Sequence, residues 1–127
     1  MHLLDSDYFI YFLKGKKIIK TTLEKIQDKK VFTSIICVAE VLEGLTTTQE
    51  KEKFLKTLNI FQVIDINYPI VEVFARIRKY LRRKGRLIDN FDLLIASTCL
   101  ANNLTLVTGN ISHFKRIPGL KIYRELH

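Results

Sequence analysis

The segment DNFDLLIASTCLANNLTLV, residues 89–107, decides the fold class of this 127-residue chain. Asp89 can cap a helix that continues through Asn103, and this helix is nearly all apolar from Leu93 to Ala101. A helix that is apolar on most of its sides is a buried helix. Leu104 to Val107 follows it as a short strand. The segment therefore predicts a helix deep in the molecule that is joined directly to a strand.

Further strands and helices alternate along the rest of the chain. We expect strands at residues 2–4, 31–33, 61–66 and 120–123, and helices at residues 8–13, 18–28, 34–44, 49–60 and 68–83. This alternation predicts a single α/β domain over residues 1–127, with a mainly parallel sheet and right-handed crossovers. In such folds, the functional site lies beyond the carboxyl ends of the strands.

The charge balance indicates a polyanionic partner. The chain has 21 Lys and Arg against 13 Asp and Glu, which gives a net charge of +8. Basic side chains that displace counterions from phosphates supply affinity for nucleic acid. An ordinary basic surface is the alternative interpretation.

The apolar segments indicate a cytoplasmic protein. Cys37 and Cys99 each lie in an apolar run without a metal-binding spacing, which suits buried thiols in a reducing cytosol. Asp5 and Asp7 interrupt the first apolar stretch, so it does not resemble a signal peptide. No apolar run approaches the ~20 residues that a membrane crossing needs.

Three acidic residues occupy positions where the functional site is expected. Asp5 ends the first strand, and Glu40 lies almost two turns into the helix after the second strand. Asp92 lies in the first turn of the helix that starts at Asp89. Each acid has a plainer interpretation, because Asp5 and Asp92 could cap helices and Glu40 could be an exposed helical residue.

Taken together, the three carboxylates favour a bound cation. Two carboxylates about 5 Å apart repel by roughly 3 kcal/mol at an effective dielectric constant near 20. Three of them must become protonated, pair with a basic side chain or bind a metal. Oxygen ligands favour Mg²⁺ or Mn²⁺ over zinc. Such an ion, facing a nucleic-acid backbone, can activate a water molecule for phosphodiester cleavage.

Four motifs, in chain order, resemble those of the PIN-domain, VapC-type toxins. Residues 3–7 (LLDSD) resemble the family's LLDTN opening, and residues 34–44 (SIICVAEVLEG) are similar to its S-x-x-x-x-x-E-L-x-x-G helix. Residues 85–88 (GRLI) and 91–96 (FDLLIA) match the third acidic block. Residues 106–110 (LVTGN), Phe114 and residues 117–120 (IPGL) match the family's C-terminal ending.

This resemblance implies a PIN-like three-layer α/β/α sandwich and Mg²⁺-dependent endoribonuclease activity, with RNA as the substrate. It also implies a toxin that a separate, cognate antitoxin protein silences. By motif, the catalytic and metal-binding residues are Asp5, Glu40 and Asp92, with Thr108 and Asn110 in supporting positions.

The chain departs from the family pattern at two positions. Asp7 replaces the common Asn, and Asn110 stands where many PIN nucleases have a fourth acid. Because a neutral amide holds a cation weakly, we expect one firmly bound metal rather than two. Asp89 could supply the missing charge or simply cap its helix. His113 could contact the substrate or be an ordinary surface histidine.

Two further groups of residues are candidates for binding partners. The basic group could bind RNA phosphates or be a solvated helix end, and consists of Arg82, Arg83, Lys84 and Arg86. The aromatic run from Tyr8 to Phe12 exceeds what one buried face needs. We expect it to serve a protein interface, either in a homodimer or as the groove for the antitoxin.

Other functions fit the residues less well. A haloacid-dehalogenase-like phosphatase needs DxDx(T/V), and Phe9 occupies the fifth position of that motif here. A receiver domain needs a Lys after a late strand, and residues 104–110 contain none. The strongest alternative is a non-catalytic RNA- or protein-binding module on a PIN scaffold.

Overall fold

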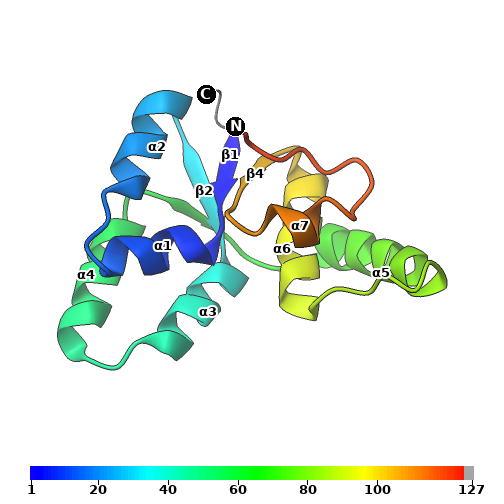
Figure 1. The fold of residues 1–127 in the computed structure, drawn as a ribbon, viewed down its shortest axis with the longest axis horizontal. Coiled ribbons are helices and arrows are strands. Elements are labelled where there is room, and N and C mark those ends of the chain that lie inside the picture. Colours follow the sequence, from blue (N-terminus) through cyan, green and yellow to red (C-terminus); the bar gives the residue numbers. More distant parts are fainter. Residues whose placement is uncertain (125–127) are drawn as a thin grey trace.

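A four-stranded sheet forms the centre of the computed structural model, which describes residues 1–124. The strands are β1 (His2–Leu4), β2 (Val31–Ser34), β3 (Gln62–Ile64) and β4 (Thr105–Val107). They lie in the order β3-β2-β1-β4, and every neighbouring pair is parallel (Figure 1). The predicted α/β class and parallel sheet are confirmed. The last three residues of the predicted domain lie outside the described part.

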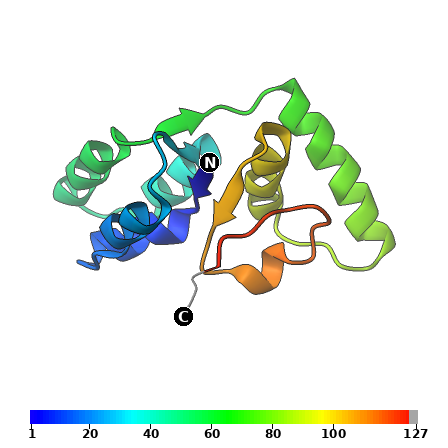
Figure 2. The same ribbon diagram turned by 90° about the horizontal axis from the view of Figure 1, so that it is seen from above.

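Helices cover both faces of the sheet. Figures 1 and 2 show α1, α2 and α4 on one side and α5 and α6 on the other, which is the predicted three-layer sandwich. Within residues 1–124, no helix combines the length and the apolar character that crossing a membrane requires. The helices are α1 (Ser6–Leu13), α2 (Ile18–Ile26), α3 (Ile35–Gly44), α4 (Thr48–Leu58), α5 (Tyr68–Arg83), α6 (Asn90–Asn102) and α7 (Ile111–Phe114).

Strand β1 contributes to two hydrophobic cores. Leu3 packs in the core that α5 and α6 cover, whereas Leu4 packs in the core that contains Phe9 of α1 and Phe54 of α4. The division follows from strand geometry, because successive side chains of a strand point to opposite faces of the sheet. The two cores fix β1 from both sides and so fix the position of the residue that follows it.

Helix α6 is buried, as the sequence predicts. Leu93, Ile95 and Cys99 have no exposed surface. The polar side chains of this buried helix bond back to its own backbone: Ser97 Oγ donates to the Leu93 carbonyl at 2.6 Å, and Thr98 Oγ1 to the Leu94 carbonyl at 2.8 Å. These hydrogen bonds allow two hydroxyl groups to lie inside the core without the cost of an unpaired polar atom.

Apart from small shifts in helix ends, the predicted secondary structure differs from the structure in three places. The strand expected at 61–66 is limited to Gln62–Ile64, and the helix α7 was not predicted. Residues 120–123 form no strand, because Ile122 makes only one isolated parallel bridge with Leu106.

The strand ends position the functional site. Because β1, β2 and β4 are parallel, their carboxyl ends lie at one edge of the sheet. Asp5 follows β1, helix α3 follows β2, and Thr108 follows β4.

Candidate active site

Asp5 is held in place by both its backbone and its side chain. Its backbone N–H donates to the Val107 carbonyl at 2.9 Å, which extends the pairing of β1 with β4 by one residue. One carboxylate oxygen accepts the Ser6 N–H at 2.7 Å, and the other accepts the Thr108 hydroxyl at 2.7 Å. Only 4% of Asp5 is exposed. The carboxylate is therefore buried, fully oriented and aimed from the end of the central strand.

These contacts correct the expected start of the first helix. Asp5 is the N-cap of α1, in line with its plainer interpretation, and the helix begins at Ser6 instead of at Tyr8. The cap does not exclude a second role for Asp5, because the cap uses one carboxylate oxygen and Thr108 binds the other.

Thr108 connects the end of β4 to Asp5. Its hydroxyl donates to Asp5 and accepts the Asn110 backbone N–H at 3.0 Å. Because the accepted N–H occupies one side of the hydroxyl oxygen, its proton is directed toward Asp5. Thr108 is only 4% exposed, so water does not compete for these bonds.

Glu40 is linked to Asp5 through Ser6. Ser34 caps α3 by accepting the Ile36 N–H at 3.0 Å, and Glu40 lies further along that helix. Ser6 Oγ is 3.1 Å from Glu40 Oε1 and 3.5 Å from Asp5 Oδ1. The bridging role of Ser6 was not predicted from the sequence, where its position directly after Asp5 was the available signal.

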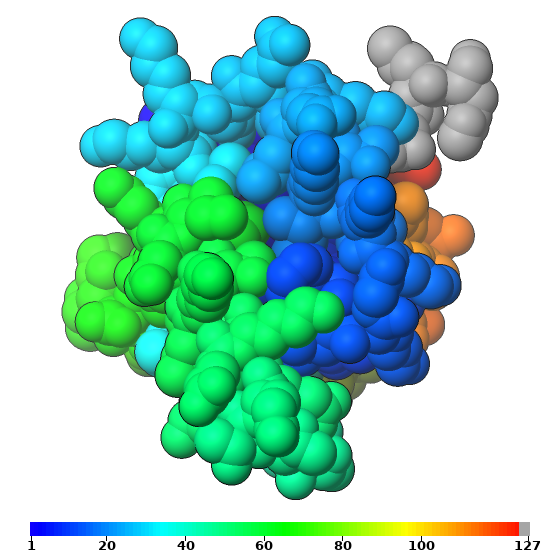
Figure 3. All heavy atoms as spheres, turned by 90° about the vertical axis from the view of Figure 1, so that its left-hand side faces the viewer, coloured from blue at the N-terminus to red at the C-terminus, as the bar shows by residue number. Residues whose placement is uncertain are grey.

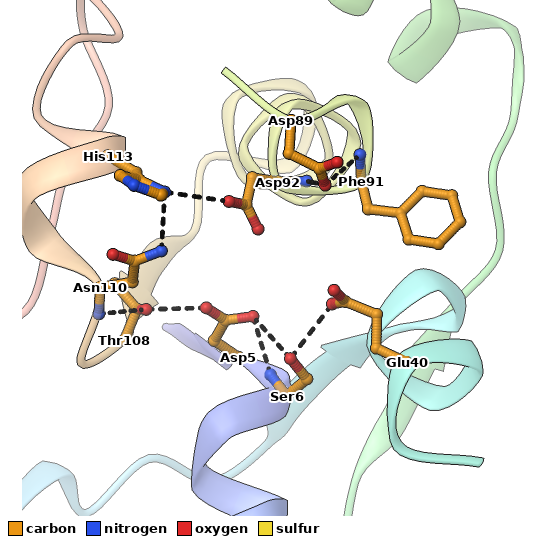
Figure 4. A network of polar contacts seen from close by, with 9 residues as sticks. All are labelled: Asp5, Ser6, Glu40, Asp89, Phe91, Asp92, Thr108, Asn110 and His113. Atoms are coloured by element: carbon orange, nitrogen blue, oxygen red, sulfur yellow. Dashed lines mark hydrogen bonds and ion pairs between the residues drawn. The ribbon is translucent and has the colours of Figure 1, made fainter. Parts of the chain in front are cut away.

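Asp92 faces the same space from the start of α6 (Figure 4). Asp89 caps this helix by accepting the N–H groups of Phe91 at 3.0 Å and of Asp92 at 3.3 Å. The Asp92 carboxylate takes no part in the cap and lies 3.4 Å from His113 Nδ1. The capping interpretation of Asp89 is confirmed, and the Asp92 side chain remains available to the site.

Burial, more than mutual repulsion, hinders the ionisation of these carboxyl groups. Burial raises the pKa of Asp5 despite the hydrogen bonds that it accepts. Burial also raises the pKa of Glu40 to about 7; the Ser6 hydrogen bond opposes this rise, whereas the charges of Asp5 and Asp92 add to it. For Asp92, burial raises the pKa, and the contact with His113 opposes the rise. A cation placed among these groups would favour their charged forms.

The donor set suits a hard divalent cation, but the side chains are not closed around one. Asp5, Glu40 and Asp92 surround one space in Figure 4 and offer only oxygen atoms to it. In residues 1–124, no three His, Cys, Asp or Glu side chains form a group that could hold a metal ion as they stand. Binding of one ion by all three acids therefore requires side-chain movement.

With this geometry established, comparison with known proteins identifies the family. Residues 2–120 match the PIN domain. The chain belongs to the PIN-domain family. This confirms the family predicted from the motifs, and PIN-domain nucleases in general depend on divalent metals.

Relatives of this PIN domain are similar to it over nearly their whole length. Ribonuclease VapC2 of Rickettsia felis is 35% identical in an alignment of 126 positions that covers 94% of each chain. The tRNA(fMet)-specific endonuclease VapC of Shigella flexneri is 27% identical, over 94% of this chain and 93% of the relative. The crystal structure of VapBC2 from Rickettsia felis bound to a DNA fragment from their promoter superposes with a TM-score of 0.87, at 32% identity over 96% of both chains.

Asp7, a departure from the family pattern, lies beside the site. Its Oδ2 accepts the Gly109 N–H at 2.7 Å, while its buried Oδ1 has no hydrogen-bond partner in the described residues. Burial and, secondarily, the charge of Asp5 raise the pKa of Asp7 to about 6. A Cβ atom on residue 109 would lie 2.8 Å from Oδ2, so any side chain at this position would displace the Asp7 carboxylate.

The structure does not bring the basic group to the carboxylates. These residues are exposed at the C-terminal end of α5 and in the loop after it, and Figures 1 and 2 both show this end at the periphery of the molecule. The residues are Arg82, Arg83, Lys84 and Arg86. They could contact only a substrate that extends well beyond the acidic site.

The predicted aromatic run has both buried and accessible members. Phe9 is buried and packs edge-on against Phe54 and Phe61, with ring centroids 5.6 and 4.9 Å apart. Phe12 is half-buried and borders a groove of about 570 Å³ on the face shown in Figure 3, where α4 lies beside α1 and α2. Four lysines also line this groove: Lys16, Lys17, Lys20 and Lys53.

Proposed function

We propose that this PIN domain is a metal-dependent endoribonuclease and the toxin of a toxin–antitoxin pair, acting in the cytoplasm. The observation that carries the proposal is the meeting of Asp5, Glu40 and Asp92 at the carboxyl edge of the parallel sheet. The relatives named ribonuclease VapC agree with it. The alternative is a non-catalytic RNA- or protein-binding module on the same scaffold.

In this proposal, Asp5, Glu40 and Asp92 hold Mg²⁺, or Mn²⁺ in its place. When bound, such a cation supplies an activated water molecule and stabilises the departing oxygen of the phosphodiester. Thr108 and the Ser6 N–H orient Asp5, and Ser6 Oγ keeps Glu40 beside it. Asn110 supports the arrangement through its backbone N–H, which fixes the Thr108 hydroxyl. Burial of Asp5 excludes water that would compete for its oxygens.

The substrate is RNA, bound first through its phosphates. The net charge of +8 supplies attraction that does not depend on sequence. In a longer RNA, phosphates outside the cleavage site would bind to four basic residues: Arg82, Arg83, Lys84 and Arg86. If these residues are only a solvated helix end, their removal will leave RNA affinity unchanged.

The partner is a cognate antitoxin, which we assign to the groove beside Phe12. Lys53 Nζ lies 4.8 Å from the centre of the Phe12 ring, so the groove combines an apolar floor with positive charge. An amphipathic segment with acidic residues at its margins complements such a surface. Solved relatives are toxin–antitoxin complexes, for example one from Klebsiella pneumoniae.

We also propose a homodimer whose interface is formed by exposed apolar side chains of α3, α5 and the start of α6. These side chains are large, and more than a third of each is exposed. They are Ile35, Leu42, Val71 and Phe91. Sedimentation of the isolated chain tests this assignment, and a monomer at micromolar concentration would contradict it.

Cleavage of RNA by the purified protein tests the proposed activity. We expect cleavage of total RNA and of initiator tRNA with Mg²⁺, none with EDTA, and at least a ~100-fold slower rate for Asp5→Asn. Glu52→Gln, which removes an exposed acid of α4, is the matched control and should keep the wild-type rate. Equal rates for wild type and Asp5→Asn would leave the non-catalytic alternative.

A further inference from the structure

His113 faces the candidate site but has no role in the proposed chemistry. Its Nδ1 atom lies 2.9 Å from Asn110 Nδ2 and 3.4 Å from Asp92 Oδ2. The side chain is 47% exposed, compared with 17% for Asp92. Figure 4 shows the imidazole at the margin of the space that the carboxylates surround.

The contact with Asn110 defines the state of this nitrogen. An amide N–H that points at Nδ1 requires Nδ1 to accept, so the proton of the neutral ring lies on the other nitrogen. The lone pair of Nδ1 is then directed at the Asn110 amide, beside the Asp92 carboxylate, and becomes free for an ion when that amide rotates. The reverse assignment, with the Asn110 oxygen toward a protonated ring, would instead make an ion pair with Asp92.

The separation of 3.4 Å suits two ligands of one cation. It is longer than the 2.9–3.0 Å that is usual for an N–H···O hydrogen bond. Two donors bound at ~2.1 Å lie ~3.0 Å apart around an octahedral ion and ~3.4 Å apart around a tetrahedral ion. The Asn110 amide, at the same nitrogen, can present its oxygen as a third donor after rotation.

We propose that His113 is a metal ligand of this centre, together with Asp92, and that it makes the protein prefer a transition-metal dication to Mg²⁺. The inference deepens the proposed function, since it requires a metal at the carboxylates. Imidazole nitrogen binds first-row transition ions well, whereas Mg²⁺ takes oxygen ligands and keeps its water. Asn110, which replaces an acid of the family pattern, would then be compensated by a nitrogen donor from the next turn.

Pulsed EPR of the Mn²⁺-loaded, full-length protein tests the ligation directly. We expect ¹⁴N modulation from a directly bound imidazole in the wild type and its loss in His113→Gln with Mn²⁺ still bound. His2→Gln is the matched control, because His2 lies at the start of β1 and pairs with Asp28 at 2.7 Å. Bound Mn²⁺ without ¹⁴N modulation in the wild type, or with unchanged modulation in His113→Gln, would overturn the proposal and support the ion pair.

Calorimetric titration with Mn²⁺ and Mg²⁺ tests the selectivity. Loss of the nitrogen donor in His113→Gln should weaken Mn²⁺ binding by roughly tenfold or more and Mg²⁺ binding much less. His113→Glu, which restores an oxygen donor, should bind Mg²⁺ at least as well as wild type without ¹⁴N modulation. An equal loss for both ions would overturn the preference. If wild type binds no Mn²⁺, the proposed metal centre itself fails; if Asp5→Asn keeps both affinity and ¹⁴N modulation, only the assignment of Asp5 fails.

Discussion

The centre of the site and its rim are built in different ways. The centre consists of Asp5, Ser6 and Thr108, where the Asp5 carboxylate is buried and accepts two hydrogen bonds of 2.7 Å. The rim consists of Asp92, Asn110 and His113, whose side chains are more exposed and whose carboxylate–imidazole contact is 3.4 Å. The centre lies between two hydrophobic cores, whereas the rim depends on the first turn of α6 and on the four-residue helix α7.

This difference separates two properties of a metal site. A carboxylate fixed by short hydrogen bonds cannot adjust, so the centre sets where a cation binds. Side chains with long contacts can move at little cost, so the rim can close on the ion and determine which ion is preferred. Changes at the centre should therefore alter stability and activity together, and changes at the rim should alter metal selectivity with little effect on folding.

Metal addition should produce the largest effect on stability, and Asp5 should determine it. A ligand that binds only the folded state stabilises by RT ln(1 + [L]/Kd), or about 2.7 kcal/mol at a hundredfold excess over Kd. Mg²⁺ or Mn²⁺ should thus raise the melting temperature by several degrees. Asp5→Asn should melt higher than wild type in EDTA, because it removes a buried carboxylate whose pKa is raised, and should gain less from metal. Identical metal-induced shifts in both proteins would show that Asp5 is not a ligand.

Removal of the Thr108 hydroxyl tests how far the centre depends on one bond. Thr108→Val leaves one oxygen of Asp5 and the Asn110 N–H without their partner, at a cost of about 1–3 kcal/mol. Denaturation in urea should show this loss, and Thr108→Ser, which keeps the hydroxyl, should recover most of it. If valine and serine are equally stable, the hydroxyl does not orient the centre.

Asp7 offers a smaller test with a defined pH dependence. Its ordinary pKa of 3.8 rises to about 6 in the fold, so the folded state resists ionisation that the unfolded chain allows. The penalty is absent well below pH 3.8, grows as the pH rises from 3.8 to the folded pKa of about 6, and is complete above it. In EDTA, the free energy of unfolding of Asp7→Asn should exceed that of wild type by about 1–2 kcal/mol at pH 7.5, after allowance for partial exposure. At pH 3.5 the two proteins should be nearly equal in stability. Melting at several pH values measures this, and a difference independent of pH would contradict it.

The meeting of the three acids could be predicted from the sequence because it follows from topology. Asp5 directly follows a strand, Glu40 lies in the helix after a strand, and parallel strands end at one edge. The burial of α6 could also be predicted, since its apolar run from Leu93 to Ala101 leaves no polar face. Such features depend on residue order and composition alone.

The remaining features could not be predicted from the sequence, because they depend on contacts between distant segments. Asp5 and Asp7 are equally good caps by sequence, but the Asp5 N–H bonds to the Val107 carbonyl, which holds Asp5 extended and makes it the cap. Helix α7 is too short to show a helical period. The direction of His113, and hence its contact with Asp92, depends on how that short helix packs. Residues 120–123 have strand-like composition, yet Ile122 forms only one bridge.

Substitutions at the exposed C-terminal end of α5 should have the smallest effect, and this effect should fall on RNA affinity. In the Asp5→Asn background, which prevents cleavage, replacing Arg82, Arg83 and Arg86 with alanine removes up to three phosphate contacts. Each contact with a single strand contributes about 0.7 to the slope of log affinity against log salt, so the slope should fall by about 2. Neither folding nor metal binding should change, because these side chains are exposed and lie away from the carboxylates. Fluorescence anisotropy with a labelled RNA, measured between 50 and 300 mM KCl, provides the slope. The control is a variant of equal net charge, in which alanine replaces three exposed lysines of α2 and α4 (Lys20, Lys25 and Lys51). Equal slopes for the two triple variants would mean that only net charge matters and that the end of α5 is an ordinary solvated surface.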